Sequence, residues 1–135
     1  MPQYLAKLPQ STQNAIGYVR KITGTYNGNS SGGDNSVTGD KCFILSGKEI
    51  FGGSGAGNGF NGTTNEANAT VQYQYFQRIA TSTASRTINS NYQWWWLRSP
   101  DYNQYNTFGC VDNGSAANRH TPMAVYDVFP AFCIY

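Results

Sequence analysis

The sequence predicts an α+β domain with two short helices early in the chain and a mostly antiparallel sheet with long irregular loops late in it. The 135 residues have the length of one domain. Apolar residues recur at helical spacing within residues 10–22, which favours a helix there. Beyond residue 90, short apolar runs alternate with turn residues, a pattern typical of antiparallel strands.

The first predicted helix spans residues 10–22. Ser11 or Thr12 can cap its N-terminus, and Gly24 follows it where a helix-ending glycine is expected. Residues 25–39 are rich in Gly, Asn and Ser, and we expect a long loop or a loose hairpin there.

The second predicted helix follows a strand over residues 40–46. Ser46 is a typical N-cap, and Glu49 three residues later completes a capping box. Gly52 and Gly53 come soon after, and glycine is unfavourable inside a helix, so this helix is predicted to be short.

The middle of the chain carries weaker signals. Residues 54–69 are rich in Gly and Asn and are predicted to form an irregular surface excursion. Residues 73–79 contain aromatic side chains and are predicted to form a short helix or turn on the core. Residues 81–91 are polar and are predicted to form a connection.

Residues 94–100 read WWWLRSP and are predicted to form a central strand. Side chains alternate along a strand, so Trp94 and Trp96 would point to one face and Trp95 to the other. A sheet with aromatic residues on both faces must be covered on both faces or must present one of them to a ligand. We expect Pro100 to end the ladder because proline has no N–H to donate.

The predicted structural core of this strand comprises Trp95, Trp96, Arg98 and Pro100, whereas Trp94 is expected to be partly exposed. The Arg98 guanidinium can stack on an aromatic ring and bridge backbone carbonyls beneath a loop. Arg98 is therefore predicted to stabilise the domain rather than to bind a ligand.

The C-terminal third continues the predicted sheet. Residues 108–112 are expected to form a strand, and Asn113 and Gly114 a tight hairpin turn, because both tolerate positive φ angles. Residues 118–122 are expected to be a polar loop. Residues 124–135 are apolar and strand-like.

Composition limits the classes of partner. Only 12% of the residues are charged and the net charge is +2, which gives no argument for a nucleic acid or an anionic membrane as partner. No apolar run approaches the ~20 residues of a membrane-spanning helix, so we expect no membrane insertion. The chain has 10 Tyr and abundant Asn, Ser and Gly, a composition typical of recognition loops.

The three cysteines, Cys42, Cys110 and Cys133, show no Cys-x-x-Cys spacing. This argues against a structural zinc site and against a disulfide framework. Each lies in an apolar run, so buried thiols are expected, although a single bridge is left open.

The sequence gives no catalytic signature, and we expect no enzyme, no cofactor and no metal. Ser99, Asp101 and His120, the only histidine, could be drawn as a triad, but no nucleophile elbow surrounds the serine. The few acidic residues suggest neither a glycosidase pair nor a full calcium ligand set. We therefore expect His120 and Arg119 to form an exposed recognition pair.

Several segments share their order and spacing with one family: DKCFILS (40–46), EIFG (49–52), VQYQYF (71–76) with Arg78 and Ile79, WWLRSP (95–100), Phe108 and Val111 ahead of Gly114, and PAFCI (130–134). Together they resemble the domain of unknown function numbered 6273, found in bacterial proteins that include phage and prophage products. The resemblance covers residues 40–135 and, more loosely, residues 1–39. The departure from the family pattern is at residues 127–130, where this chain has DVFP.

The resemblance implies a C-type-lectin-like fold, as in phage tail-tip and retroelement-diversified receptor-binding proteins. Residues 40–135 would form the ligand-binding domain, and residues 1–39 would add an N-terminal helix and a Gly/Asn/Ser-rich lead-in to the same domain. Residues 42–45 would pair with residues 132–134, as the first and last strands of such folds do. The loops would form one exposed face with Asp101, Tyr102, Asn103, Gln104, Tyr105, Asn106, Asp112, Asn113, Ser115, Asn118, Arg119, His120 and Tyr126.

On this basis the leading hypothesis is a non-enzymatic domain that recognises a host receptor, in a phage or prophage tail or a retroelement-diversified variable protein. Its partner would be a glycan or protein of the bacterial cell surface, and its location the virion or the outside of a bacterial cell. A bacterial surface adhesin is an alternative. A second class is a structural module of a virion or secreted assembly, such as a homotrimer, with the Tyr/Asn loops buried between subunits.

Overall fold

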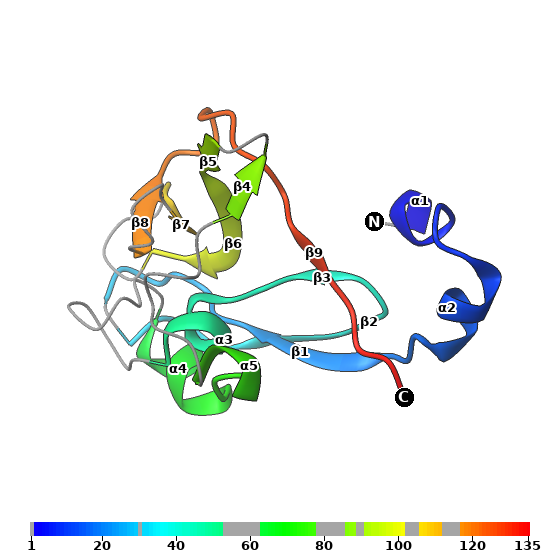
Figure 1. Ribbon diagram of the computed structural model, residues 1–135. Coiled ribbons are helices and arrows are strands. Elements are labelled where there is room, and N and C mark those ends of the chain that lie inside the picture. Colours follow the sequence, from blue (N-terminus) through cyan, green and yellow to red (C-terminus); the bar gives the residue numbers. More distant parts are fainter. Residues whose placement is uncertain are drawn as a thin grey trace.

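The computed structural model describes residues 2–29, 31–52, 63–77, 86–88, 91–101, 106–111 and 117–135. These residues form short helices and small antiparallel sheets (Figure 1). The sheet at the upper left of Figure 1 and the helices below it lie together, while the N-terminal helices project to the right. The predicted α+β class is confirmed.

Two short helices and a β-hairpin begin the chain: α1 (Pro2–Leu5), α2 (Gln10–Ala15), β1 (Val19–Thr23) and β2 (Ser36–Asp40). The helix predicted over residues 10–22 is therefore wrong in its second half. The apolar residues of β1 are β-branched, and their stiff side chains favour a strand. β1 pairs antiparallel with β2 over all five residues, so the hairpin left open by the sequence exists but starts before residue 25.

The residues that were predicted to begin and end that helix have other roles in the structure. Pro9, not Ser11 or Thr12, occupies the N-cap position of α2 and makes no side-chain cap. A Cβ added to Gly24 would lie 2.3 Å from Thr63 Oγ1, and the Gly24 N–H donates to Glu66 Oε2 at 2.8 Å. Glycine is needed at this position for close backbone approach.

The capping box predicted at Ser46 is confirmed in α3 (Gly47–Phe51). The Glu49 N–H donates to Ser46 Oγ at 3.2 Å, and the Ser46 N–H donates to Glu49 Oε2 at 2.9 Å. Gly52 ends the helix with a φ angle of +72°, a left-handed conformation that favours glycine. The strand predicted over residues 40–46 is shorter than expected, since β3 comprises Phe43–Ile44 alone.

The described residues contain more helices than the two that the sequence predicts. α5 (Gln74–Gln77) lies within residues 73–79, for which the sequence predicted a short helix or turn. α4 (Thr64–Ala69) lies in the predicted irregular excursion, residues 54–69. Its N-cap Thr63 accepts a hydrogen bond from the Glu66 N–H at 3.3 Å, a local signal that the high Asn content obscured.

The late strands are β4 (Arg86–Ile88), β5 (Asn91–Gln93), β6 (Trp95–Pro100), β7 (Phe108–Val111) and β8 (Ala117–His120). β4 pairs with β5, and a separate sheet has the order β6-β7-β8. The connection predicted over residues 81–91 and the loop predicted over 118–122 are therefore corrected. Their polar side chains hid strands that are held by ladder hydrogen bonds.

β6 was expected to be a central strand, but β7 occupies the centre of the three-stranded sheet. The other edge of β6 is nevertheless bonded to the rest of the chain. The Trp96 N–H donates to the Asp127 carbonyl and the Arg98 N–H to the Leu45 carbonyl, each at 3.0 Å. Pro100 is the last residue of β6, as predicted.

The two ends of the predicted lectin-like segment pair, as expected. β3 forms an antiparallel ladder with β9 (Pro130–Ala131), in which Phe43 lies opposite Ala131. The ladder lies two residues earlier in the C-terminal segment than predicted, and Ile134 instead bridges to Ile16. Figure 1 shows this last segment running from the three-stranded sheet past β3 to the C-terminus.

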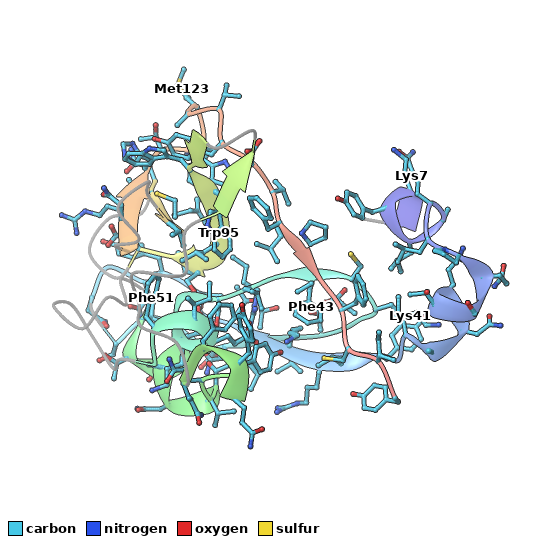
Figure 2. The ribbon with its side chains drawn as sticks, viewed as in Figure 1. Lys7, Lys41, Phe43, Phe51, Trp95 and Met123 are labelled. Atoms are coloured by element: carbon cyan, nitrogen blue, oxygen red, sulfur yellow. The ribbon has the colours of Figure 1, made fainter. Side chains whose placement is uncertain are left out.

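The core joins β6 to the helices and to β3. Trp95 has no exposed surface, and its ring meets the edge of Phe129 at a centroid distance of 5.5 Å. Figure 2 shows Trp95 inside the body of the protein, with the side chains of Phe51 and Phe43 also inside it. The core residues are Phe43, Leu45, Ile50, Phe51, Phe76, Trp95, Leu97 and Val111.

Two further predictions concern the cysteines and membrane-spanning helices. Cys42 and Cys110 are buried and Cys133 is half-buried, and no disulfide joins the three within the described chain. Among the residues that the structure describes, no helix has the length and apolar character to span a bilayer.

Candidate ligand-binding face

The three-stranded sheet has one face in the core and the other turned outward. Trp95 lies opposite Val111 in the β6-β7 ladder, and both side chains are fully buried. Trp96 lies opposite Cys110, and these neighbours point to the other face because side chains alternate along a strand. Trp96 is only half-buried, so it belongs to the outer face rather than to the core in which it was expected.

Four rings gather on this outer face and form what we call the aromatic face: Trp94, Trp96, His120 and Tyr126. Tyr126 stacks on Trp94 at 5.2 Å between ring centroids and lies tilted over Trp96 at 4.9 Å. The His120 ring meets Trp94 at 5.2 Å and Tyr126 at 5.3 Å, edge to face in both pairs. All four side chains are half-buried, so the cluster is packed and still offers ring surface to a ligand.

The strands of the sheet and the segment that bridges to β6 hold the four rings of the aromatic face in position. Trp94 and Trp96 flank the buried Trp95, and His120 is the last residue of β8. Tyr126 lies beside the parallel bridge between Trp95 and Asp127. Partial burial raises the pKa of the Tyr126 hydroxyl, and Cys110 adds a smaller effect in the same direction, so this hydroxyl is a neutral hydrogen-bonding group at physiological pH.

A hollow of 320 Å³ adjoins the aromatic face and shares Trp96 with it. It lies where β3, β6 and β7 meet the segment that follows β8. Phe108, at its edge, is 39% exposed. The residues that line the hollow are Ile44, Trp96, Leu97, Arg98, Phe108 and Pro122.

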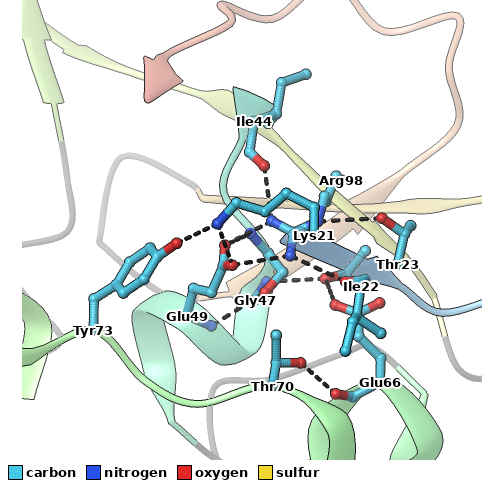
Figure 3. A network of polar contacts seen from close by, with 12 residues as sticks. Lys21, Ile22, Thr23, Ile44, Gly47, Glu49, Glu66, Thr70, Tyr73 and Arg98 are labelled. Carbon is cyan, nitrogen blue, oxygen red and sulfur yellow. Dashed lines mark hydrogen bonds and ion pairs between the residues drawn. The ribbon is translucent and has the colours of Figure 1, made fainter. Parts of the chain in front are cut away.

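Arg98 lines the hollow and is fixed by a network of polar contacts (Figure 3). It donates to both carboxylate oxygens of Glu49, at 2.6 and 3.0 Å. It also donates to the carbonyls of Ile44 at 2.9 Å and Ile22 at 3.0 Å, and to Thr23 Oγ1 at 3.2 Å. A guanidinium has five N–H donors, and these five bonds use them all. The prediction that Arg98 bridges backbone carbonyls is confirmed, with Glu49 as a partner that the sequence did not identify.

Lys21 provides a second cation for the same carboxylate. Its ammonium donates to Glu49 Oε1 at 2.9 Å and to the Tyr73 hydroxyl, and it lies 3.6 Å from the centre of the Phe43 ring. Burial lowers the pKa of Lys21, while the hydrogen bond and charge of Glu49 oppose that change. Burial and the charge of Glu49 raise the pKa of the Tyr73 hydroxyl.

The two buried carboxyl groups differ in their electrostatics. Burial, the largest single effect, would raise the pKa of Glu49, but the hydrogen bonds and charge of Arg98 together with the bonds from Ser46 and Lys21 outweigh it, and the pKa lies below its usual value. Glu66 accepts from Ser99 Oγ at 2.5 Å and from the Gly24 N–H, yet burial dominates and raises its pKa. Both acids are buried and bonded to groups of the protein itself, so this network links distant parts of the fold.

The loop residues predicted to bind a ligand are only partly described. Asn106 is exposed, and Asn118 is half-buried with its side-chain oxygen accepting from the Arg119 N–H at 2.8 Å. His120 and Tyr126 lie together on the aromatic face. The predicted positions that lie outside the described residues are Tyr102, Asn103, Gln104, Tyr105, Asp112, Asn113 and Ser115.

Asp101 and Arg119 correct the predicted loop face. Asp101 was grouped with the exposed positions but has no exposed surface. Its Oδ2 lies 3.2 Å from Nε of Arg119, and its N–H donates to the Thr107 carbonyl at 3.0 Å. Arg119 and His120 are neighbours in β8 and therefore point to opposite faces, so they do not form the expected exposed pair.

Sequence reasoning did not place Trp94, Trp96 or Phe108 in a site. The sequence could have predicted a site at the two tryptophans, because Trp94 and Trp96 alternate with the buried Trp95 and must therefore lie together on the other face of the sheet. Phe108 lies opposite His120 in the β7-β8 ladder, a pairing hidden when residues 118–122 are taken as a loop. Within the part of the chain that the structure describes, no group of three His, Cys, Asp or Glu residues could hold a metal ion.

Comparison with known proteins gives one match. A family model described as "Domain of unknown function (DUF6273)" matches residues 2–135. No curated protein and no solved structure matches the chain.

Proposed function

The chain belongs to the family of domain of unknown function 6273, whose description assigns no activity, and we propose that it is a non-enzymatic ligand-binding domain that uses the aromatic face for recognition. The observation that carries this proposal is the packing of Trp94, Trp96, His120 and Tyr126 on the outer face of a sheet whose inner face is already filled. A domain that needed these rings only for its core would bury them.

The chemistry of the face supports binding rather than catalysis. Aromatic rings provide large contact areas at low entropic cost, and they are common anchors at protein interfaces. The buried carboxyl groups of Glu49 and Glu66 bond to the protein's own groups. Neither is placed to act on a substrate at the aromatic face.

The proposed setting is recognition of a glycan or protein on the bacterial cell surface, by a phage or prophage tail protein or a retroelement-diversified variable protein. The pairing of β3 with β9 supports a C-type-lectin-like arrangement of the segment that follows the β1-β2 hairpin, since β3 and β9 are the first and last strands of that segment. In such a protein, Tyr102 and Tyr105, which lie outside the described residues, would be further candidates for ligand contact. A bacterial surface adhesin would use the same face.

A structural role in an assembly is the second candidate, because Met123 and Val125 are 91% and 96% exposed. Figure 2 shows Met123 at the tip of its loop, pointing away from the body. Exposed apolar residues in a cluster can mark a subunit interface. In that role the loop would be buried between subunits, for example those of a homotrimer, and the domain would need no receptor.

Binding of the fluorescently labelled domain to intact bacterial cells, measured by flow cytometry, separates these candidates. The test variant is His120→Ala with Tyr126→Ala, and the matched control is Tyr18→Ala, a ring 72% exposed on another part of the chain. We expect saturable binding that the control retains and the test variant loses at an unchanged melting temperature. Binding that survives in the test variant, or no binding to any host in the native oligomer, would contradict the proposal.

A further inference from the structure

The hollow beside the aromatic face has a lining that selects for one kind of group. Its volume of 320 Å³ lies at the lower end of the range of about 300–1,000 Å³ for small-molecule sites. Ile44, Leu97, Phe108 and Pro122 contribute apolar side chains, and Trp96 contributes its indole ring. A hollow of this size and lining suits one ring system rather than an extended ligand.

Arg98 does not make the hollow a site for an anion. Its side chain is 11% exposed, and its five donors are taken by Glu49, Thr23 and two backbone carbonyls. The charge of the guanidinium is balanced by the carboxylate that it contacts at 2.6 Å. A phosphate or carboxylate would have to compete with Glu49 for donors that are already in use, and breaking a buried ion pair is unfavourable.

The residues that line the hollow also disfavour a sugar inside it. A sugar ring carries hydroxyl groups on its edge, and a buried hydroxyl without a partner is costly. Among the lining residues, Arg98 has no N–H donor left for a ligand, and the other five are largely apolar. An aromatic side chain makes no such demand and is a common anchor at the centre of protein interfaces.

We propose that this hollow is an anchor pocket that receives an uncharged aromatic side chain of a protein ligand. The inference rests on the proposed function and names the chemistry by which that same face would recognise its partner. Trp96 belongs both to the pocket and to the aromatic face, so an inserted ring would contact Trp96 while neighbouring parts of the ligand lay across Tyr126. Phe108, paired with His120 across the strands, forms the exposed edge of the pocket.

The test is a titration of the isotopically labelled whole chain with small probes, followed by amide and indole NMR shifts. The probes are N-acetyl-tryptophanamide and N-acetyl-phenylalaninamide, with methyl glucoside, N-acetylglucosamine and inorganic phosphate as the competing chemistries. We expect the aromatic amides to shift Trp96, Leu97 and Phe108 in a saturable way. Phe108→Ala should weaken that binding about tenfold, the usual loss for an interface anchor.

Met123→Ala is the matched control, because Met123 follows Pro122 but does not line the hollow. It should leave the aromatic amides bound as in the wild type, and both variants should keep the wild-type melting temperature. Shifts that follow the sugars or phosphate instead, or aromatic amides that bind equally well to Phe108→Ala, would overturn the inference.

The titration requires no host cell, so its failure can be told apart from failure of the proposed function. A domain that binds cells through the aromatic face but no aromatic amide would refute the anchor pocket alone. A domain that binds the amides at the pocket but no cell would support the pocket and refute host recognition.

Discussion

Removal of Arg98 perturbs the largest number of long-range polar contacts in the network. The side chain joins β6 to β1, β3 and α3 through bonds to Ile22, Thr23, Ile44 and Glu49. Arg98→Ala deletes all five bonds and leaves Glu49 with Lys21 as its one remaining cation within the described network. It also leaves two backbone carbonyls without this donor.

The magnitude follows from the state of the remaining partners. Removing one member of a buried ion pair typically costs about 3–5 kcal/mol, and each buried acceptor left without a donor costs about 1–3 kcal/mol. Lys21 retains part of the interaction with Glu49, and water entering the vacated space can bond to the carbonyls. We therefore expect a loss of about 3–5 kcal/mol in the free energy of unfolding, which lowers the melting temperature by roughly 10 °C or more.

Urea unfolding followed by tryptophan fluorescence measures this loss directly. Arg20→Ala is the matched control, because Arg20 lies in β1 and is exposed, and it should change stability by less than about 0.5 kcal/mol. Arg98→Lys keeps the charge but lacks the planar five-donor fork, and it should fall between the two. An Arg98→Ala protein within about 1 kcal/mol of the wild type would refute the reasoning.

Three further variants test other parts of the account. Folding lowers the pKa of Glu49 below its usual value of 4.5. The ionised carboxylate therefore stabilises the fold above pH 4.5, and this stabilisation is lost as the pH falls through the folded pKa. Glu49→Gln should have a lower melting temperature at neutral pH, and its melting temperature should depend less on pH in the acid range. Gly52→Ala should lower the free energy of unfolding in urea by about 1–2 kcal/mol, because the φ angle of Gly52 is +72° and an added Cβ would meet the Gln72 side chain. An unchanged free energy of unfolding would contradict the left-handed conformation at the end of α3. Asp101→Asn should lower the melting temperature by a few degrees, because it removes the charge of a buried group from its ion pair with the partly exposed Arg119; an unchanged value would show that this pair is not stabilising.

Local signals were sufficient to predict the elements whose causes lie within a few residues. The capping box at Ser46 and the end of α3 at Gly52 follow from side-chain chemistry three to six residues apart. The alternation of Trp94, Trp95 and Trp96 follows from the geometry of any strand. The structural role of Arg98 was also predicted, because a guanidinium can bridge backbone carbonyls, and it donates to those of Ile22 and Ile44; the ring stacking predicted beside it is not among the contacts of the described residues.

Elements that depend on distant partners could not be predicted in this way. Residues 19–23 have helical spacing, but pairing with residues 36–40 turns them into a strand. Residues 117–120 are polar, and only the ladder to β7 shows that they form β8. Burial of Asp101 depends on Arg119, eighteen positions away (119 − 101), and adjacent polar loop residues gave no sign of it.

The central claim is that the outer face of the β6-β7-β8 sheet contacts the receptor. Hydroxyl-radical footprinting of the domain, free and bound to envelopes of a bacterium that it recognises, tests this most directly. The account predicts that Trp94, Trp96 and Tyr126 become protected from oxidation on binding, while Tyr18 and Tyr135, both largely exposed, react as before. Protection of Tyr18 or Tyr135 with unchanged reactivity of the three face residues would contradict it.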